Sequence, residues 1–179
     1  INEKKIFNTL SSHRLRLNVE NNLIYDDKDL QGQLELTLIN RIKKINYHLK
    51  TNILNFDTSD GKINGDINIK PFFLFSNIKL YEIDLKKIFK ENSILINIIK
   101  SEILNSKNLN GQINVFSDSV KGQYFLDGVS FNILLEEGNI FIEDFKTTFK
   151  DSVNIKLTNT QLIVDNNEIN FSGNLELDF

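Results

Sequence analysis

The stretch KINGDINIK, residues 62–70, alternates apolar and polar side chains and sets the pattern for the whole chain. Ile63, Ile67 and Ile69 share one set of alternate positions with Gly65, whereas Lys, Asn and Asp occupy the other set. Successive side chains of a β-strand point to opposite faces of the sheet. The stretch is therefore predicted to be a strand of a sheet with one apolar and one polar face.

The overlapping stretch DTSDGKINGD, residues 57–66, has the composition of a calcium-binding loop but the wrong register. With Gly61 at the sixth position of an EF-hand loop, the first and twelfth ligand positions fall on Phe56 and Ile67. Neither side chain can coordinate a hard cation. Asp-Gly is a strong turn signal, so a turn between two strands is expected here.

The same alternation recurs along the chain, most cleanly in EINFSGNLELDF at residues 168–179. Hairpin connections are expected at Gly138-Asn139 and at residues 165–167. We predict a β-rich upstream part at residues 1–56 and a main β region at residues 57–179, belonging to one sheet. The predicted strands lie at 14–19, 33–39, 45–49, 62–70, 72–80, 110–116, 122–126, 129–136, 139–149, 153–164 and 168–179.

One segment, residues 84–104, has a different period. Asp84 can cap a first helical turn, and apolar residues from Ile94 to Leu104 recur at spacings of three and four. One or two short helices are predicted at about 84–104, lying on the apolar face of the sheet. An interfacial membrane helix is the alternative, although the polar side lacks the usual basic stripe.

Composition excludes several classes of function. The chain has 179 residues, a net charge of -3 and no Cys, so disulfides and thiolate metal sites are absent. Scattered Lys residues provide no electrostatic footprint for nucleic acid, and no apolar run approaches the ~20 residues of a membrane span. The lack of Met and the uninterrupted final strand predict a fragment of a longer chain.

No catalytic constellation emerges from the sequence. His48 falls on the polar side of its strand, and His13 follows Ser12 without the glycine-flanked elbow of a nucleophilic serine. Acidic pairs at 26–27 and 136–137 are expected to be solvated beside turns, although a pair of carboxylates on opposed strands stays open. We expect no enzyme activity, no catalytic residue, no metal site and no cofactor.

The fold class expected from these patterns is all-β with a minor α element. A long, twisted antiparallel meander would curl into a β-groove or an open sandwich. Something must cover the apolar face, because each buried Ile, Leu or Phe side chain stabilises by ~1.5–3 kcal/mol. A second layer of the protein and a bound apolar ligand are both open at this point.

From residue 60 onward, the order of these features resembles the C-terminal region of AsmA-like proteins of Gram-negative bacteria. The resemblance rests on DGKINGDINI, on IKLYEIDLKKIF leading into an apolar helix, on LNGQINVFSDSV, and on the closing strands with their EEGN turn. It implies a bridge-like lipid carrier in the periplasm, whose parent chain is anchored in the inner membrane. It also implies phospholipid or another acyl-chain ligand as partner, and a role in outer-membrane assembly or lipid transport.

Residues expected to line such a groove are apolar and share one face of the predicted strands. An alternative is a structural or adhesive β-module that binds protein partners through a sheet edge, and each apolar residue could equally be plain core. The predicted lining residues are Ile113, Val115, Phe131, Ile133, Ile140, Ile142, Ile155, Leu157, Ile169 and Phe171.

Overall fold

The computed structural model describes residues 4–13, 16–25, 29–38, 41–88, 90, 93, 96, 106–150, 152–165 and 168–179. These residues form twelve strands and one short helix, α1 (Leu85–Ile88). The strands are β1 (Lys4–Ser12), β2 (Leu17–Tyr25), β3 (Asp29–Leu38), β4 (Arg41–Lys50), β5 (Ile53–Thr58), β6 (Ile63–Ile69), β7 (Phe72–Ile83), β8 (Gly111–Val120), β9 (Leu126–Glu136), β10 (Asn139–Phe149), β11 (Val153–Asp165) and β12 (Glu168–Asp178).

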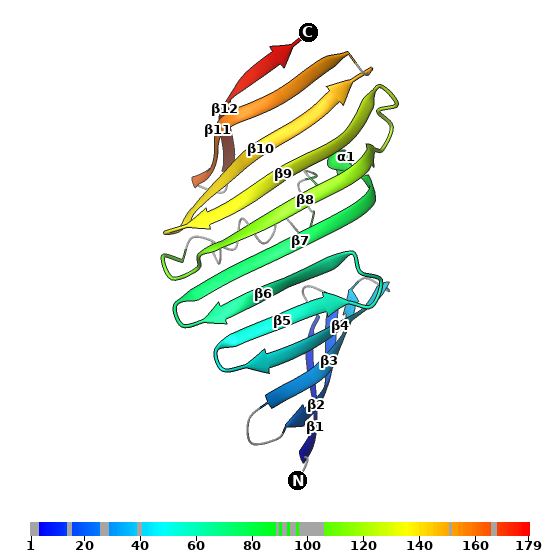
Figure 1. Ribbon diagram of the computed structural model, residues 1–179, viewed down its shortest axis with the longest axis vertical. Coiled ribbons are helices and arrows are strands. Elements are labelled where there is room, and N and C mark those ends of the chain that lie inside the picture. The colour runs from blue at the N-terminus through cyan, green and yellow to red at the C-terminus, as the bar shows by residue number, and fades with distance from the viewer. Residues whose placement is uncertain are drawn as a thin grey trace. The chain divides into compact units, whose positions relative to one another are not determined.

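The twelve strands follow one another in the sheet in their order along the chain (Figure 1), and the sheet is not closed. The predicted all-β fold with a minor helical element is confirmed. The chain separates into two compact units, residues 1–72 and residues 73–179. We call them unit 1 and unit 2 and describe each by itself.

Unit 1 is an antiparallel meander from β1 to β6 with one apolar and one polar face. Directly paired residues of neighbouring strands lie on the same face of a sheet. One row of the register, for example, joins Leu10 to Val19 and Val19 to Leu36. A neighbouring row joins Glu20 to Glu35, and Glu35 to Lys44. The predicted alternation therefore persists across the strands of this unit.

Unit 2 is antiparallel from β8 to β12, but β7 and β8 run parallel. The expectation of a purely antiparallel meander is wrong for this pair. Two parallel strands need a long crossover connection, because the chain must return to the end of the sheet from which it started. Residues 84–110, which include α1, make that connection.

Helix α1 begins as predicted, with Asp84 as its cap. The backbone amide of Lys87 donates a hydrogen bond of 3.0 Å to Asp84 Oδ1, which satisfies one of the free amides of the first turn. Leu85 and Ile88 pack against the apolar face of unit 2. Of the predicted helical range, residues 89–104 lie outside the described residues except for Lys90, Ser93 and Ile96.

Two irregular positions reverse the alternation inside unit 2. Asp144 on β10 and Asn159 on β11 have positive φ angles of 51° and 52°. The pairing of β10 with β9 shifts register near Asp144, and the pairing of β11 with β12 shifts register near Asn159. A β-bulge adds one residue to a strand and so exchanges its two faces beyond that point. Ile142 before the irregularity and Phe145 after it consequently lie on the same apolar face.

The turn between β5 and β6 is a hydrogen-bonded hairpin connection, as predicted for the Asp-Gly pair. Thr58 is buried, and its hydroxyl donates to Asp60 Oδ1 at 2.7 Å and accepts from the amide of Ile63 at 3.0 Å. Asp60 also forms an ion pair with Lys43 of β4. The hydrogen bonds from Lys43 and Thr58 hold the pKa of Asp60 well below its ordinary value of 3.8.

Acidification is expected to weaken this hairpin. Because the folded-state pKa of Asp60 is depressed, its contribution to stability is present above pH ~4 and is lost as the carboxylate is protonated at lower pH. Asp60→Asn should lower the urea midpoint at neutral pH, and its deficit relative to the wild type should shrink as the pH falls below 4. Asp118→Asn, at an exposed carboxylate on β8, is the control. A deficit that is independent of pH would contradict this assignment.

Candidate functional site: the apolar face of the sheet

The apolar face of unit 1 has no second layer among the described residues of that unit. Its described apolar side chains are half-buried or exposed, and each fully buried apolar side chain among the described residues belongs to unit 2. Unit 1 therefore presents a broad one-sided apolar surface built from β1 to β6. Its members are Ile6, Leu10, Leu17, Val19, Leu23, Leu30, Leu34, Leu36, Ile45, Tyr47, Leu49, Leu54, Phe56, Ile63 and Ile67.

A glycine in the middle of β3 shapes this face. Gly32 is paired with Tyr47 of β4 on one side and with Leu23 of β2 on the other. A Cβ atom at position 32 would overlap the Tyr47 hydroxyl and ring. The absence of a side chain lets Tyr47 lie across β3 and donate a 2.7 Å hydrogen bond to Asn21 Oδ1 on β2. Desolvation raises the pKa of Tyr47, and the Asn21 hydrogen bond opposes that shift.

In unit 2 the register places the predicted lining residues on one face, but part of that face is covered. Ile113 and Phe131 pack against the buried cluster of Ile83, Val115, Val120 and Val129, which also contacts α1. Phe131 stacks on Phe145 with ring centroids 6.2 Å apart. A second buried cluster consists of Leu135, Ile140 and Leu162, and Ile133 and Leu109 pack on it. Ile113, Val115, Phe131, Ile133 and Ile140 therefore lie in the packed core.

The remaining predicted residues lie toward the C-terminal strands. Ile142, Ile155 and Leu157 are half-buried, and Phe171 on β12 is exposed. Ile169 is paired with Val164 in the register of β11 and β12. Leu175 and Leu177 continue the apolar face of β12 and are also exposed. The face of unit 2 thus changes from covered at β8 and β9 to open at β12.

Sequence reasoning did not predict that the apolar face of unit 1 lacks a second layer among the described residues of that unit. Apolar and polar residues alternate at 15–19, 34–38 and 45–49, which predicts an apolar face on these strands. Alternation does not show whether another layer of the protein covers that face. The covering segment of unit 2 comes from the crossover, which is distant in sequence from most of the strands that it packs on. Coverage is consequently a tertiary property of the chain.

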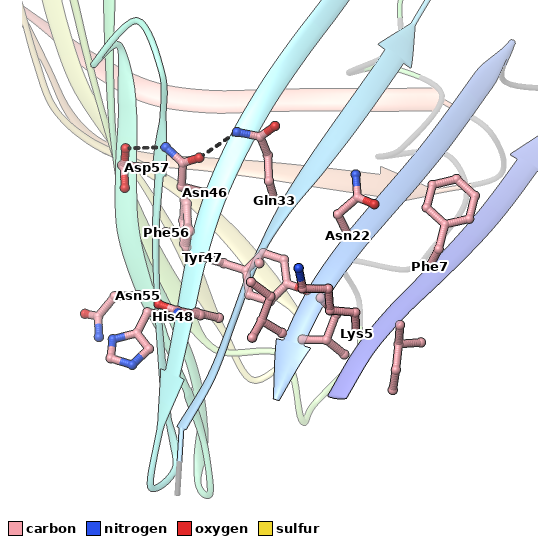
Figure 2. A pocket seen from close by; sticks show the side chains of 15 residues that line it. Lys5, Phe7, Asn22, Gln33, Asn46, Tyr47, His48, Asn55, Phe56 and Asp57 are labelled. Carbon is pink, nitrogen blue, oxygen red and sulfur yellow. Dashed lines mark hydrogen bonds between the residues drawn. The ribbon is translucent and has the colours of Figure 1, made fainter. Parts of the chain in front are cut away.

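A hollow of about 840 Å³ lies on unit 1 and is shown in Figure 2. Each of the strands β1 to β5 contributes three consecutive residues to its lining, such as Asn46, Tyr47 and His48. The outer two of each triplet belong to the polar face. The hollow therefore lies on the polar face, with the backbone of each middle residue as its floor.

Amide side chains form a row across this polar hollow. Gln33 Nε2 donates to Asn46 Oδ1 at 2.9 Å, and Asn46 Nδ2 donates to Asp57 Oδ2 at 3.3 Å, as Figure 2 shows. Unit 2 has a similar row, in which Asn114 Nδ2 donates to Asn77 Oδ1 at 2.8 Å. These rows join polar side chains of neighbouring strands by hydrogen bonds across the polar face of each unit.

The residues considered for chemistry do not converge. His48 lies on the polar face, 3.7 Å from Asp29, and His13 lies in the turn between β1 and β2. Glu137 lies in the β9–β10 turn, whereas residues 26–27 lie outside the described residues. No group of three or more potential metal ligands occurs in the part of the chain that the structure describes. Within the same residues, no helix has the length and apolar character needed to cross a bilayer.

The fold and this surface define a class of one-sided β-sheet protein with a partly uncovered apolar face. No protein-family model, curated protein or solved structure matches the chain.

Proposed function

We propose that the chain is a non-enzymatic protein of the bacterial envelope that binds or guides phospholipid along the apolar face of its sheet. In this function it supports outer-membrane assembly or lipid transport. It acts in the periplasm, as part of a parent chain anchored in the inner membrane. The ligand class is one with acyl chains, and the side chains of the apolar face solvate those chains without reacting.

The observation that carries the proposal is the uncovered apolar face of unit 1. Apolar side chains that follow one another across β1 to β6 form a surface far more continuous than scattered exposed residues, and continuous apolar patches on proteins mark sites of interaction. Each methylene that an acyl chain buries there contributes ~0.8 kcal/mol. The opposite face carries the rows of hydrogen-bonded polar side chains, so the apolar body of a ligand would bind the apolar face.

The test compares exposed apolar residues on the two faces of unit 1. Ile6 and Leu10 are 45% and 69% exposed on the apolar face, whereas Phe7 and Ile42 are 61% and 59% exposed on the polar face. Ile6→Asn/Leu10→Asn should reduce phospholipid retained in native mass spectrometry roughly tenfold, since it removes ~1–2 kcal/mol of apolar contact. Phe7→Asn/Ile42→Asn is the matched control and should retain the wild-type amount.

Thermal unfolding of both double variants shows whether folding is altered. All four side chains are exposed, so the free energy of unfolding should change little in either variant. A wild-type chain that retains no phospholipid and takes up none from added vesicles would overturn the proposal. Equal losses of lipid in the two double variants would also contradict it, because the effect would then be independent of the face.

A second candidate function follows from β1, which is an edge strand of the sheet. Exposed Ile6 and Leu10 on one face and Phe7 on the other make this edge apolar on two sides. Edge strands can bind an extended segment of a partner protein through backbone hydrogen bonds. In the same mass spectra, a lipid-free dimer or heterocomplex would favour this function, whereas a lipid-bound monomer would favour lipid handling.

A further inference from the structure

One end of unit 1 carries an excess of basic side chains. In an antiparallel meander, alternate strand ends lie at the same end of the sheet, so β1, β3 and β5 finish at one end of unit 1. The last residue of β5, Thr58, pairs with Ile45, which is four residues along β4 from Arg41. Arg16 lies in the turn that follows β1, Arg41 begins β4, and Lys62 precedes β6. Among the described residues of unit 1, both arginines lie at this end, whereas the opposite end carries Lys4, Lys5, Lys50 and Lys70 with Asp29.

The register brings the two arginines close to each other. Leu17 of β2 is paired with Leu38 of β3, which is paired with Arg41 of β4. Arg16 immediately precedes Leu17, so the two arginines are two strands apart at the same end of the sheet. Neighbouring strands are ~4.8 Å apart, which places the two backbones roughly 10 Å from each other. Two arginine side chains whose backbones are that far apart are long enough to contact one anionic group.

The basic end is continuous with the apolar face. Arg41 and Lys43 occupy apolar-face positions of β4, since they are paired with Leu38 and Leu36 of β3. The apolar face of this strand therefore gives way to two cationic side chains at its end. An amphipathic ligand that lies along β4 would contact apolar side chains with its acyl chains and cationic side chains with its headgroup.

Most of this positive charge is unneutralised. Lys43 pairs with Asp60, and Lys44 on the polar face pairs with Glu35 at 3.5 Å. Arg16, Arg41 and Lys62 are exposed and have no acidic partner within the part of the chain that the structure describes. Arginine is suited to phosphate because its planar guanidinium can donate two parallel hydrogen bonds to two oxygens.

We infer that Arg16 and Arg41 bind the phosphate of anionic lipid headgroups whose acyl chains lie on the apolar face of unit 1. The inference rests on the proposed function and deepens it by naming the lipid class and the end of the sheet at which the headgroup lies. Charge complementarity selects anionic phospholipid over neutral and zwitterionic lipid. The opposite end has lysines but no arginine among its described residues.

The experiment measures binding of the full chain to vesicles of phosphatidylglycerol and of phosphatidylcholine by co-sedimentation. Arg16→Gln/Arg41→Gln should weaken binding to phosphatidylglycerol vesicles roughly 30-fold, because each basic residue near an anionic surface contributes about a factor of five. Binding to phosphatidylcholine should not change. Lys50→Gln/Lys70→Gln removes the same charge from the opposite end and should leave both affinities within about twofold of the wild type.

Further measurements separate this inference from the proposed function. Arg16→Lys/Arg41→Lys, which keeps the charge but loses the two parallel donors, should recover only part of the binding to phosphatidylglycerol, and added salt should weaken that binding. Equal losses in the two charge-removing variants, or equal wild-type affinity for the two vesicles, would overturn the headgroup assignment. A neutral diacylglycerol probe tests the apolar face alone: if the wild type does not bind it, the proposed function fails, whatever the vesicle result.

Discussion

Ile83→Ala is expected to lower the free energy of unfolding by about 2–5 kcal/mol. Ile83 is 1% exposed and is the most deeply buried apolar side chain of unit 2, in a cluster with Val115, Val120 and Val129. Truncation removes apolar contacts and leaves a cavity between β7, β8 and the crossover. Because this cluster packs the crossover onto the sheet, the loss should appear in the unfolding of unit 2.

Urea denaturation followed by circular dichroism measures this effect. Tyr81→Ala is the control on the same strand, since Tyr81 is 76% exposed and its truncation should change the free energy of unfolding by less than about 0.5 kcal/mol. Equal costs for the two variants would show that the face under the crossover is not packed. The same experiment bears on the sequence-predicted lining residues, because Val115 and Phe131 belong to this cluster.

Gly32→Val is expected to destabilise unit 1 by about 2–4 kcal/mol. The new Cβ would overlap the Tyr47 side chain and would lie 2.5 Å from the backbone oxygen of Asn22. Overpacking of this kind typically costs ~1–3 kcal/mol, and displacement of Tyr47 also breaks its hydrogen bond to Asn21, which contributes about 1 kcal/mol.

A double-mutant cycle with Tyr47 tests the cause of this loss. Tyr47→Phe should cost only about 1 kcal/mol, because it removes the hydroxyl and keeps the ring. Gly32→Val should cost less in a Tyr47→Ala background than in the wild type, since one of the two overlaps is then absent. If Gly32→Val has the same cost in both backgrounds, the ring of Tyr47 does not account for the requirement for glycine.

Local sequence was sufficient to predict most strands of this fold and which side of each is apolar. It did not predict β1 or β5, and the strand predicted at 122–126 is a turn that precedes β9. The alternation of residues 62–70 predicts β6, and the final alternating stretch predicts β12, because side-chain direction in a strand depends on position alone. Asp84 predicts the start of α1, since a cap acts within one turn of helix. The turn at residues 59–62 is likewise a property of its own few residues.

Other features of the fold depend on contacts between distant segments. The parallel pairing of β7 with β8 requires residues 84–110 to cross the sheet, and no local pattern distinguishes this from a hairpin. The irregularities at Asp144 and Asn159 exchange the faces of their strands, so Phe145 joins Ile142 on the apolar face against simple alternation. Strand pairing, and not the sequence around each bulge, decides this outcome.

Alternation along the chain is enough to specify a β-sheet with one apolar and one polar face, because it needs only the two-residue period of a strand. Which part of the apolar face becomes core depends instead on tertiary contacts. That division depends on where the crossover packs: over Val115 and Val129 of unit 2, whereas the apolar face of unit 1 has no such layer among its described residues. Burial results from contacts between distant segments, which the period of a strand cannot specify.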